Sequence, residues 1–156
     1  MMTDEQATKT VSALYLRWAE ALTKHDAEWF ERHIASDFSL SAHPFPQLRF
    51  DKRKFIEVDM QIENTRIIFL DIRGHAVGDI LVSQAIAEVT EDFRADLGEG
   101  MPTAAEVTKL LSGQVLAYTS AWRRVGDVWQ CFDHHMIGPV KSVQHKPAAE
   151  SAWASA

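Results

Sequence analysis

Apolar side chains in the first quarter of the chain recur at the spacing of an α-helix. They fall three or four residues apart and form one apolar stripe: Val11, Leu14, Tyr15, Trp18 and Leu22. Asp4 and Glu5 stand near the expected helix start, where the helix dipole favours negative charge. A second helix is predicted over residues 27–35, because the Asp26 side chain can cap the free amides of its first turn.

The pattern then changes to the alternation of a β-strand. Residues 38–43 alternate apolar and polar positions up to Pro44, which has no amide to donate to a sheet. Asp51 is expected to cap a third, short helix over residues 52–60.

Two β-hairpins are predicted in the second half of the chain. The first joins strands 65–73 and 80–93 through a turn at 74–79, and the second joins strands 114–124 and 128–138 through a turn at 125–127. Between them, residues 94–102 are expected to form a loop. Thr103 and Glu106 have the spacing of a capping box at the start of a helix over 104–111.

Helices followed by antiparallel hairpins predict the α+β class, with a curved antiparallel sheet wrapped around the N-terminal helices. A length of 156 residues favours one domain, which we place at residues 1–140. The Ala- and Ser-rich segment 141–156 is expected to be a flexible tail in which Trp153 can dock on the domain.

Composition narrows the function classes. The net charge of −6 argues against binding to nucleic acid or to an anionic membrane surface, since both need a basic face. No apolar run approaches the roughly 18 residues of a membrane-spanning helix. Cys131 is the one cysteine, so an internal disulfide is excluded and a reducing, cytoplasmic location is expected.

Two stretches resemble the NTF2-like (nuclear transport factor 2-like) superfamily, and in particular its SnoaL-like, DUF4440-type and ketosteroid-isomerase-like members. WAEALTKHDAEWFERHIASDFSL, residues 18–40, is similar to the helix–Asp–helix–Asp-Phe opening of the family. YTSAWRRVGDVWQCFDHHMIGP, residues 118–139, resembles the closing hairpin, with its Trp-basic-basic, Gly-x-x-Trp and His-x-x-x-Gly pattern. The resemblance covers residues 8–140. It implies a cone-shaped fold with a conical pocket and a homodimer formed through the outer face of the sheet.

The resemblance also implies which side chains face the pocket. The expected ligand-binding residues are Tyr15, Trp18, Phe38, Phe45, Phe55, Tyr118, Ser120, Trp122, Phe132 and Met136. His134 is expected among them as a general base, because an apolar pocket favours neutral imidazole. His43 is the second candidate catalytic residue, because it stands where ketosteroid isomerases place their catalytic aspartate.

Alternation on the last strand separates the Asp-His-His run into two faces. His134 and His135 are adjacent, so they point to opposite sides of the sheet and cannot bind one metal ion together. We therefore expect neither a metal nor a cofactor. The outer face, with Trp129, Asp133, His135 and Ile137, is the expected dimer interface, and Cys131 is expected on that same face.

The hypothesis from the sequence is a protein that binds a small apolar or aromatic ligand, acting as an acid–base isomerase, cyclase or dehydratase. The alternative is a non-catalytic dimerisation or association module. Ketosteroid isomerase activity itself is not expected, because Trp18 and Ser120 stand at the tyrosine and aspartate positions of its oxyanion hole. Asp71, Arg73 and Asp92 have the residue types of the epoxide-hydrolase site, but the pattern does not place them on one inward face.

Overall fold

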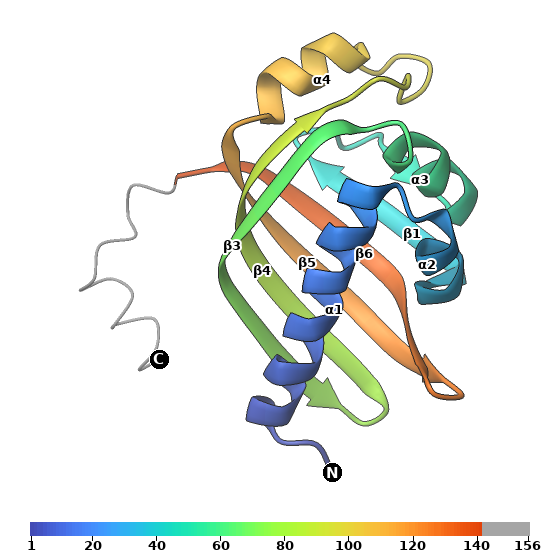
Figure 1. The fold of residues 1–156 in the computed structure, drawn as a ribbon, viewed down its shortest axis with the longest axis vertical. Coiled ribbons are helices and arrows are strands. Elements are labelled where there is room, and N and C mark those ends of the chain that lie inside the picture. The colour runs from blue at the N-terminus through green and yellow to red at the C-terminus, as the bar shows by residue number, and fades with distance from the viewer. Residues whose placement is uncertain (142–156) are drawn as a thin grey trace.

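The computed structural model describes residues 1–141 (Figure 1). The predicted tail, including Trp153, lies almost wholly outside these residues. The helices are α1 (Asp4–Lys24), α2 (Ala27–His33), α3 (Lys52–Asp59) and α4 (Ala104–Leu111), and the strands are β1 (Ile34–His43), β2 (Arg49–Phe50), β3 (Glu63–Val77), β4 (Ile80–Asp92), β5 (Gln114–Val125) and β6 (Val128–Val140). Within the described part of the chain, no helix is long and apolar enough to span a membrane.

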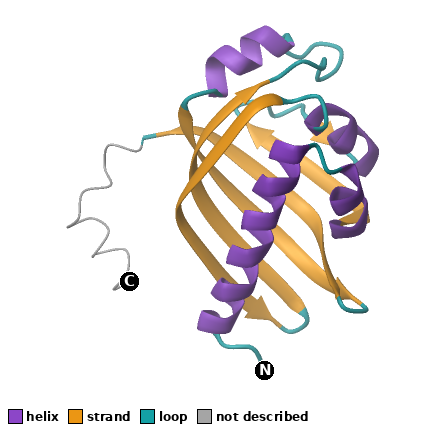
Figure 2. Cartoon of the chain, in the orientation of Figure 1, coloured by secondary structure: helices purple, strands orange, loops and turns teal. Residues whose placement is uncertain are grey.

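The strands form one curved sheet in the order β2-β1-β6-β5-β4-β3, and helix α1 crosses its concave side (Figures 1 and 2). The predicted hairpins β3–β4 and β5–β6 are confirmed, as is the α+β class. The expectation of a wholly antiparallel sheet was wrong for one pair, because β1 runs parallel to β6. A parallel pair needs a long connection, and here the rest of the chain supplies it.

Helix α1 forms where the apolar stripe predicted it. Thr3 and Gln6 make a reciprocal capping box at its start, and the chain leaves the helix at His25 in the left-handed conformation. The side chains of Val11, Tyr15, Trp18 and Leu22 are all buried, because this stripe packs against the concave side of the sheet. The helix therefore brings Tyr15 and Trp18 into the interior.

Gly74 sets how closely α1 approaches β3. A Cβ atom at this position would lie 2.7 Å from the carbonyl carbon and oxygen of Ala7, so any larger residue would push the helix away. Thr8 fastens the contact, since its Oγ1 accepts a hydrogen bond from the Gly74 amide at 3.0 Å. The predicted turn at 74–79 was therefore wrong in its first half: β3 continues to Val77, because this glycine serves close packing rather than a turn.

The boundary between α2 and β1 differs from the prediction. Asp26 caps α2 as expected, with Oδ1 accepting from the Trp29 amide at 3.1 Å. Helix α2 ends at His33, and the fully buried Ile34 and Ala35 already belong to β1. Ile34 pairs with Cys131 of β6, and this sheet contact outweighs the helical spacing of the apolar residues.

A β-bulge in β6 changes which side chains face inward. Ala121 of β5 lies opposite Asp133, whereas Trp122 lies opposite Cys131, so Phe132 is an extra residue without a partner. Alternation is therefore inverted before the bulge. Cys131 is fully buried rather than on the outer face, and Trp129 packs against the hydrophobic core rather than facing outward.

Candidate functional site

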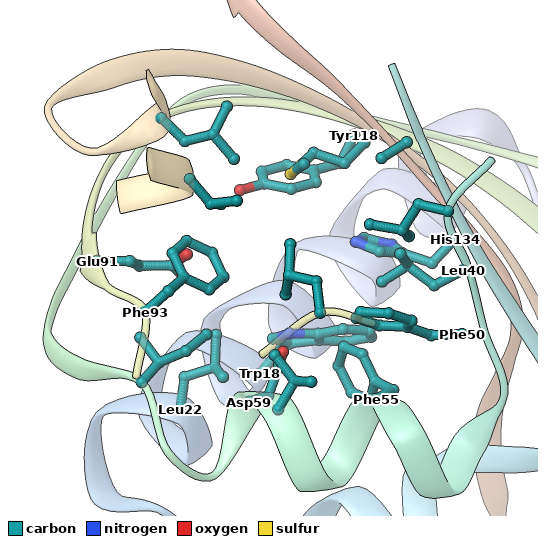
Figure 3. Close-up of a pocket in the computed structure, with 18 of the residues that line it drawn as sticks. Trp18, Leu22, Leu40, Phe50, Phe55, Asp59, Glu91, Phe93, Tyr118 and His134 are labelled. Carbon is teal, nitrogen blue, oxygen red and sulfur yellow. The ribbon is translucent and has the colours of Figure 1, made fainter. Parts of the chain in front are cut away.

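An apolar cavity of about 90 Å³ lies between the concave side of the sheet and the helices (Figure 3). Its wall includes Tyr15, Trp18 and Leu22 of α1, Phe55, Val58 and Asp59 of α3, Leu40 and Ala42 of β1, Phe69 of β3, Glu91 of β4, Tyr118 of β5, and His134 and Met136 of β6. Leu97, Val107 and Leu111 close one side. The segment containing α4 and the loop before it therefore covers the cavity.

The expected ligand-binding residues divide into two groups. Those that line the cavity are Tyr15, Trp18, Phe45, Phe55, Tyr118 and Met136, and the candidate catalytic residue His134 joins them. Those that do not line it are Phe38, Ser120, Trp122 and Phe132. Their contact with a ligand stays a prediction for the first group, and the placement of the second group needs correction.

Each side chain of the second group has a physical reason for its position. Phe38 packs in the core on Phe55, with ring centroids 5.1 Å apart, and Trp122 is fully buried behind Tyr15. The bulge turns Phe132 to the other side of the sheet, where the Arg123 guanidinium lies 4.9 Å above its ring. Ser120 lies behind the ring of His134 and not in the wall.

His43 does not join His134. Leu40 and Ala42 line the cavity, so the alternation of β1 turns His43 outward, and its side chain is exposed. The expected position beside the pocket came from the family resemblance, and the alternation of this strand contradicts it. The two histidines therefore do not face the same cavity, and a catalytic role for His43 stays a prediction.

His134 is held between two aromatic rings. Its imidazole stacks on Trp18 at 4.9 Å and on Tyr118 at 5.3 Å between ring centroids. Nδ1 lies 2.7 Å from Oγ of Ser120, and the ring edge is directed into the cavity (Figure 3). Burial lowers the pKa of His134 to about 3, so the imidazole is neutral at physiological pH.

Behind His134 lies a group of buried polar side chains, Tyr15, Ser83, Ser120 and Trp122, which we call the hydroxyl cluster. Tyr15 Oη is 2.9 Å from both serine hydroxyls, and Trp122 Nε1 donates to Ser83 Oγ at 3.0 Å. Burial, only partly offset by these hydrogen bonds, raises the pKa of Tyr15 to about 12. Every side chain of the cluster therefore has a hydrogen-bond partner inside the protein.

Two carboxyl groups on the other side of the cavity were missed by the sequence predictions. Glu91 and Asp59, which we call the carboxyl pair, point into the cavity in Figure 3. Burial raises the pKa of Glu91 to about 7, and burial together with the Glu91 charge raises the pKa of Asp59 well above its usual value. Within residues 1–141, neither carboxyl group has a hydrogen-bond or ion-pair partner.

Sequence signals for the carboxyl pair do exist. The inward row of β4 consists of Leu81, Ser83, Ala85, Ala87, Val89 and Glu91, so Glu91 is the one charged member of a small and apolar row. Asp59 follows Phe55 by four residues and so shares the inward face of α3. A charged residue on an apolar face is the pattern that would have identified both.

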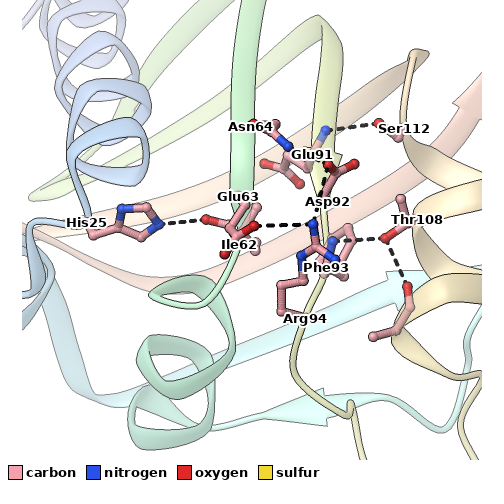
Figure 4. Close-up of polar contacts among 11 residues, drawn as sticks. His25, Ile62, Glu63, Asn64, Glu91, Asp92, Phe93, Arg94, Thr108 and Ser112 are labelled. Carbon is pink, nitrogen blue, oxygen red and sulfur yellow. Dashed lines mark hydrogen bonds and ion pairs between the residues drawn. The ribbon is translucent and has the colours of Figure 1, made fainter.

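Helix α4 fixes the backbone around Glu91 (Figure 4). Ser112 Oγ accepts from the Glu91 amide at 3.1 Å, Thr108 Oγ1 accepts from the Phe93 amide at 2.8 Å, and the Gly113 amide donates to the Val89 carbonyl at 2.7 Å. These groups replace the neighbouring strand that β4 lacks beyond the start of β5. The segment that covers the cavity, α4 with Ser112 and Gly113, therefore also fixes the backbone that carries Glu91.

No protein-family model matches the sequence, and no curated protein matches it either. Solved structures do match. An NTF2-like protein from Cytophaga hutchinsonii superposes with a TM-score of 0.65 at 14% identity, covering 83% of this chain and 96% of that one. The chain has the NTF2-like fold.

Two further structural neighbours carry functional descriptions. A putative dehydratase from Streptomyces avermitilis has a TM-score of 0.62 at 18% identity, over 86% of this chain and 96% of that one. A putative calcium/calmodulin-dependent kinase II association domain from Exiguobacterium sibiricum has a TM-score of 0.63 at 16% identity, over 84% and 91%. At these identities the likeness establishes the fold alone.

The outer face of the NTF2-like sheet differs from the expected interface. His135 points to the side of the sheet away from His134, and its Nδ1 is 2.7 Å from Ser41 Oγ. On this outer face, Asp133 is exposed and Ile137 is half-buried. Trp129 is not on this face, because the bulge turns it toward the core. Among the described residues, no group of three or more His, Cys, Asp or Glu side chains is arranged to hold a metal ion.

Proposed function

We propose that this chain is an acid–base enzyme that transfers a proton on a small, mostly apolar molecule, as an isomerase or a dehydratase does. The observation that supports this proposal is the carboxyl pair. Asp59 and Glu91 face an apolar cavity without a cationic partner among the described residues, opposite the neutral His134. Unpaired buried carboxyl groups cost stability, and such groups concentrate at functional sites.

The chemistry follows from the raised pKa values. A carboxyl group whose pKa is about 7 can take up and release a proton at neutral pH, which suits a general acid or base. Since each carboxylate disfavours ionisation of the other, the pair loses its protons in two steps. One group then acts as the base while its neighbour still holds a proton. His134 is not the base in this proposal, because its low pKa leaves it a weak proton acceptor.

The cavity limits the size of the molecule. Its volume of about 90 Å³ is smaller than the engineered cavity of about 150 Å³ that holds benzene in another protein. We therefore expect a molecule no larger than one small ring while α4 stays in place. This favours a small cyclic compound over a larger aromatic one.

A dehydratase reaction uses both members of a carboxyl pair. One carboxylate removes a proton from carbon, and one carboxylic acid protonates the departing hydroxyl group so that water leaves. The description of the Streptomyces avermitilis neighbour as a putative dehydratase supports including this reaction beside isomerisation.

Proton abstraction can be measured directly with small ketones in D₂O. We expect the wild-type protein to accelerate the deuteration of cyclopentanone or cyclopent-2-enone beside the carbonyl, followed by ¹H NMR. Glu91→Gln should lose about 100-fold or more of this rate, the usual share of a general base. Glu88→Gln on the exposed side of the same strand is the matched control and should keep it. A wild-type rate equal to buffer, or an unimpaired Glu91→Gln, contradicts the proposal.

A second candidate function is association through the outer sheet face. Ile137 is half-buried and lies on the same face as Asp133 and His135. Exposed apolar side chains also lie on β3, Ile68 and Leu70, with β5 and β4 between β3 and β6. The association-domain description of the Exiguobacterium sibiricum neighbour supports this candidate. Light scattering should show a dimer that Ile137→Asp dissociates and Val125→Asp, at the exposed β5–β6 turn, leaves intact. A monomeric wild type would exclude it.

A further inference from the structure

Two hydrogen bonds of the hydroxyl cluster have a fixed direction. Trp122 Nε1–H can donate but cannot accept, so Ser83 Oγ is the acceptor of their 3.0 Å hydrogen bond. Tyr15 Oη is the donor in its 2.9 Å contact with Ser120 Oγ. Because the tyrosine gives its single proton to Ser120, the proton of Ser83 is left either for Tyr15 Oη at 2.9 Å or for the Ser120 carbonyl oxygen at 3.3 Å.

The same counting of protons reaches His134. Ser120 Oγ has accepted from Tyr15, and its own proton is directed to His134 Nδ1, 2.7 Å away. The thiol of Cys131, its other neighbour, is a much weaker acceptor than an imidazole nitrogen. Nδ1 is then the unprotonated nitrogen, and in neutral imidazole the proton must be on Nε2.

We propose that the hydroxyl cluster fixes His134 as a hydrogen-bond donor, with Nε2–H presented to the cavity, and that the site therefore selects molecules that carry an oxygen acceptor such as a carbonyl group. Ser120 is the positioning residue that sets the tautomer. Trp18 and Tyr118 hold the ring from both faces, so the donor cannot turn aside.

This inference deepens the proposed function, on which it rests in one respect: the acceptor is taken to be the oxygen of the substrate. A donor on one wall and a carboxyl pair on the other can bind a carbonyl oxygen and remove a proton from the carbon beside it. A molecule of the same shape without an acceptor leaves the buried N–H unpaired, which is how such sites discriminate strongly.

The tautomer of His134 can be read from the ¹⁵N shifts of its two ring nitrogens, assigned by the loss of the signals in His134→Gln. We expect the wild type to carry its proton on Nε2. Ser120→Ala should release this preference and give a mixture of tautomers, and Ser120→Thr, which keeps the hydroxyl group, should restore it. A wild-type proton on Nδ1 would overturn the inference without any variant.

The chain supplies its own control for this experiment. Ser41 Oγ lies 2.7 Å from Nδ1 of His135, the same distance as in the Ser120–His134 contact, but on the outer face. Ser41→Ala should change the ring nitrogens of His135 and leave those of His134 as they are. A Ser41→Ala variant that alters His134 as much as Ser120→Ala would show a general structural effect and contradict a specific one.

The ligand preference is tested with two molecules of one shape, cyclopentanone and methylenecyclopentane, in binding titrations followed by NMR. We expect the ketone to bind at least about tenfold more tightly, the worth of one buried hydrogen bond. His134→Phe should abolish the preference, whereas Glu88→Gln, on the exposed side of β4, should keep it. Equal binding of both molecules to the wild type would overturn the inference. The tautomer and the binding ratio do not need turnover, so a failure of deuterium exchange refutes the proposed function and not this donor.

Discussion

The hydroxyl cluster lies mostly behind one wall of the cavity and the carboxyl pair lines another, and their polar groups are buried in opposite ways. Each side chain of the cluster, such as Ser83 or Ser120, has partners at hydrogen-bond distance. Glu91 and Asp59 have none among the described residues. A buried polar group with partners adds modestly to stability, and one without them costs stability. The comparison therefore separates side chains that stabilise the fold from side chains that are proposed to act on a ligand.

The largest expected loss of stability comes from a substitution in the hydroxyl cluster. Trp122 is fully buried and also donates to Ser83, so Trp122→Ala should lower the free energy of unfolding by about 3–5 kcal/mol, measured by urea denaturation. Phe93 lines the cavity and is only half-buried, so Phe93→Ala should cost about half as much or less. Equal losses would show that the two sides contribute alike to stability.

The carboxyl pair should leave a signature in the pH dependence of stability. The pKa of Glu91 is raised from 4.5 to about 7, so the folded protein binds this proton more tightly than the unfolded chain. The stabilisation from this bound proton is complete at low pH, declines as the pH rises from about 4.5, and is lost above about 7. The total loss of stability over this interval is about 3 kcal/mol. The free energy of unfolding of Glu91→Gln relative to wild type should therefore rise over this interval.

The free energy of unfolding should be compared between variant and wild type at each pH, because His134 makes stability depend on pH in the opposite direction. Its pKa is lowered to about 3, so its contribution is lost as the pH falls below the ordinary histidine value. Taking the difference cancels this term. Glu88→Gln, on the exposed side of β4, should show no such rise. A flat difference for Glu91→Gln would mean that Glu91 titrates normally.

A smaller effect is expected where the cluster loses one hydroxyl group. Ser83→Ala leaves Trp122 Nε1–H and Tyr15 Oη without their common partner, and should cost about 1–3 kcal/mol in urea unfolding. The exposed Ser36 of β1 provides the control, since Ser36→Ala should change little. A loss for Ser83→Ala no larger than this control would contradict the description of the cluster as a stabilising network.

The smallest effect concerns the cover of the cavity. Thr108→Val keeps the shape of the side chain but removes the oxygen that accepts from the Phe93 amide, at a cost of about 1 kcal/mol. Hydrogen exchange at that amide should become faster. Thr23→Val removes only a bond within α1 and should leave the exchange at Phe93 unchanged. Unchanged exchange in Thr108→Val would mean that α4 is held by its apolar contacts alone.

Much of the fold could be predicted because it depends on local patterns. The stripe of α1, the cap at Asp26 and the two hairpins follow from spacing and turn residues. The bulge at Phe132 could not be predicted, because it is a property of how β6 pairs with β5 and not of β6 itself. Gly74 was read as a turn residue, because its role depends on a helix about 65 residues away in sequence.

The candidate site could be predicted only where the local alternation of a strand holds. His134 lies beyond the bulge, so alternation placed it correctly in the wall, whereas Phe132 within the bulge was placed on the wrong face. The placement of His43 beside the pocket was wrong, because it followed the family position rather than the alternation of its own strand. Glu91 was not predicted, because the family resemblance points to histidines, although one carboxylate in an apolar row is the stronger signal.

The central claim is that the carboxyl pair holds a proton at neutral pH, ready for transfer. The most direct measurement is a pH titration of the side-chain carboxyl carbon of Glu91 by ¹³C NMR on the wild-type chain, assigned with Glu91→Gln. The predicted result is a midpoint at a pH of about 7. A midpoint near the ordinary glutamate value of about 4.3 would contradict the account, because the group would then be ionised and solvated like any surface carboxylate.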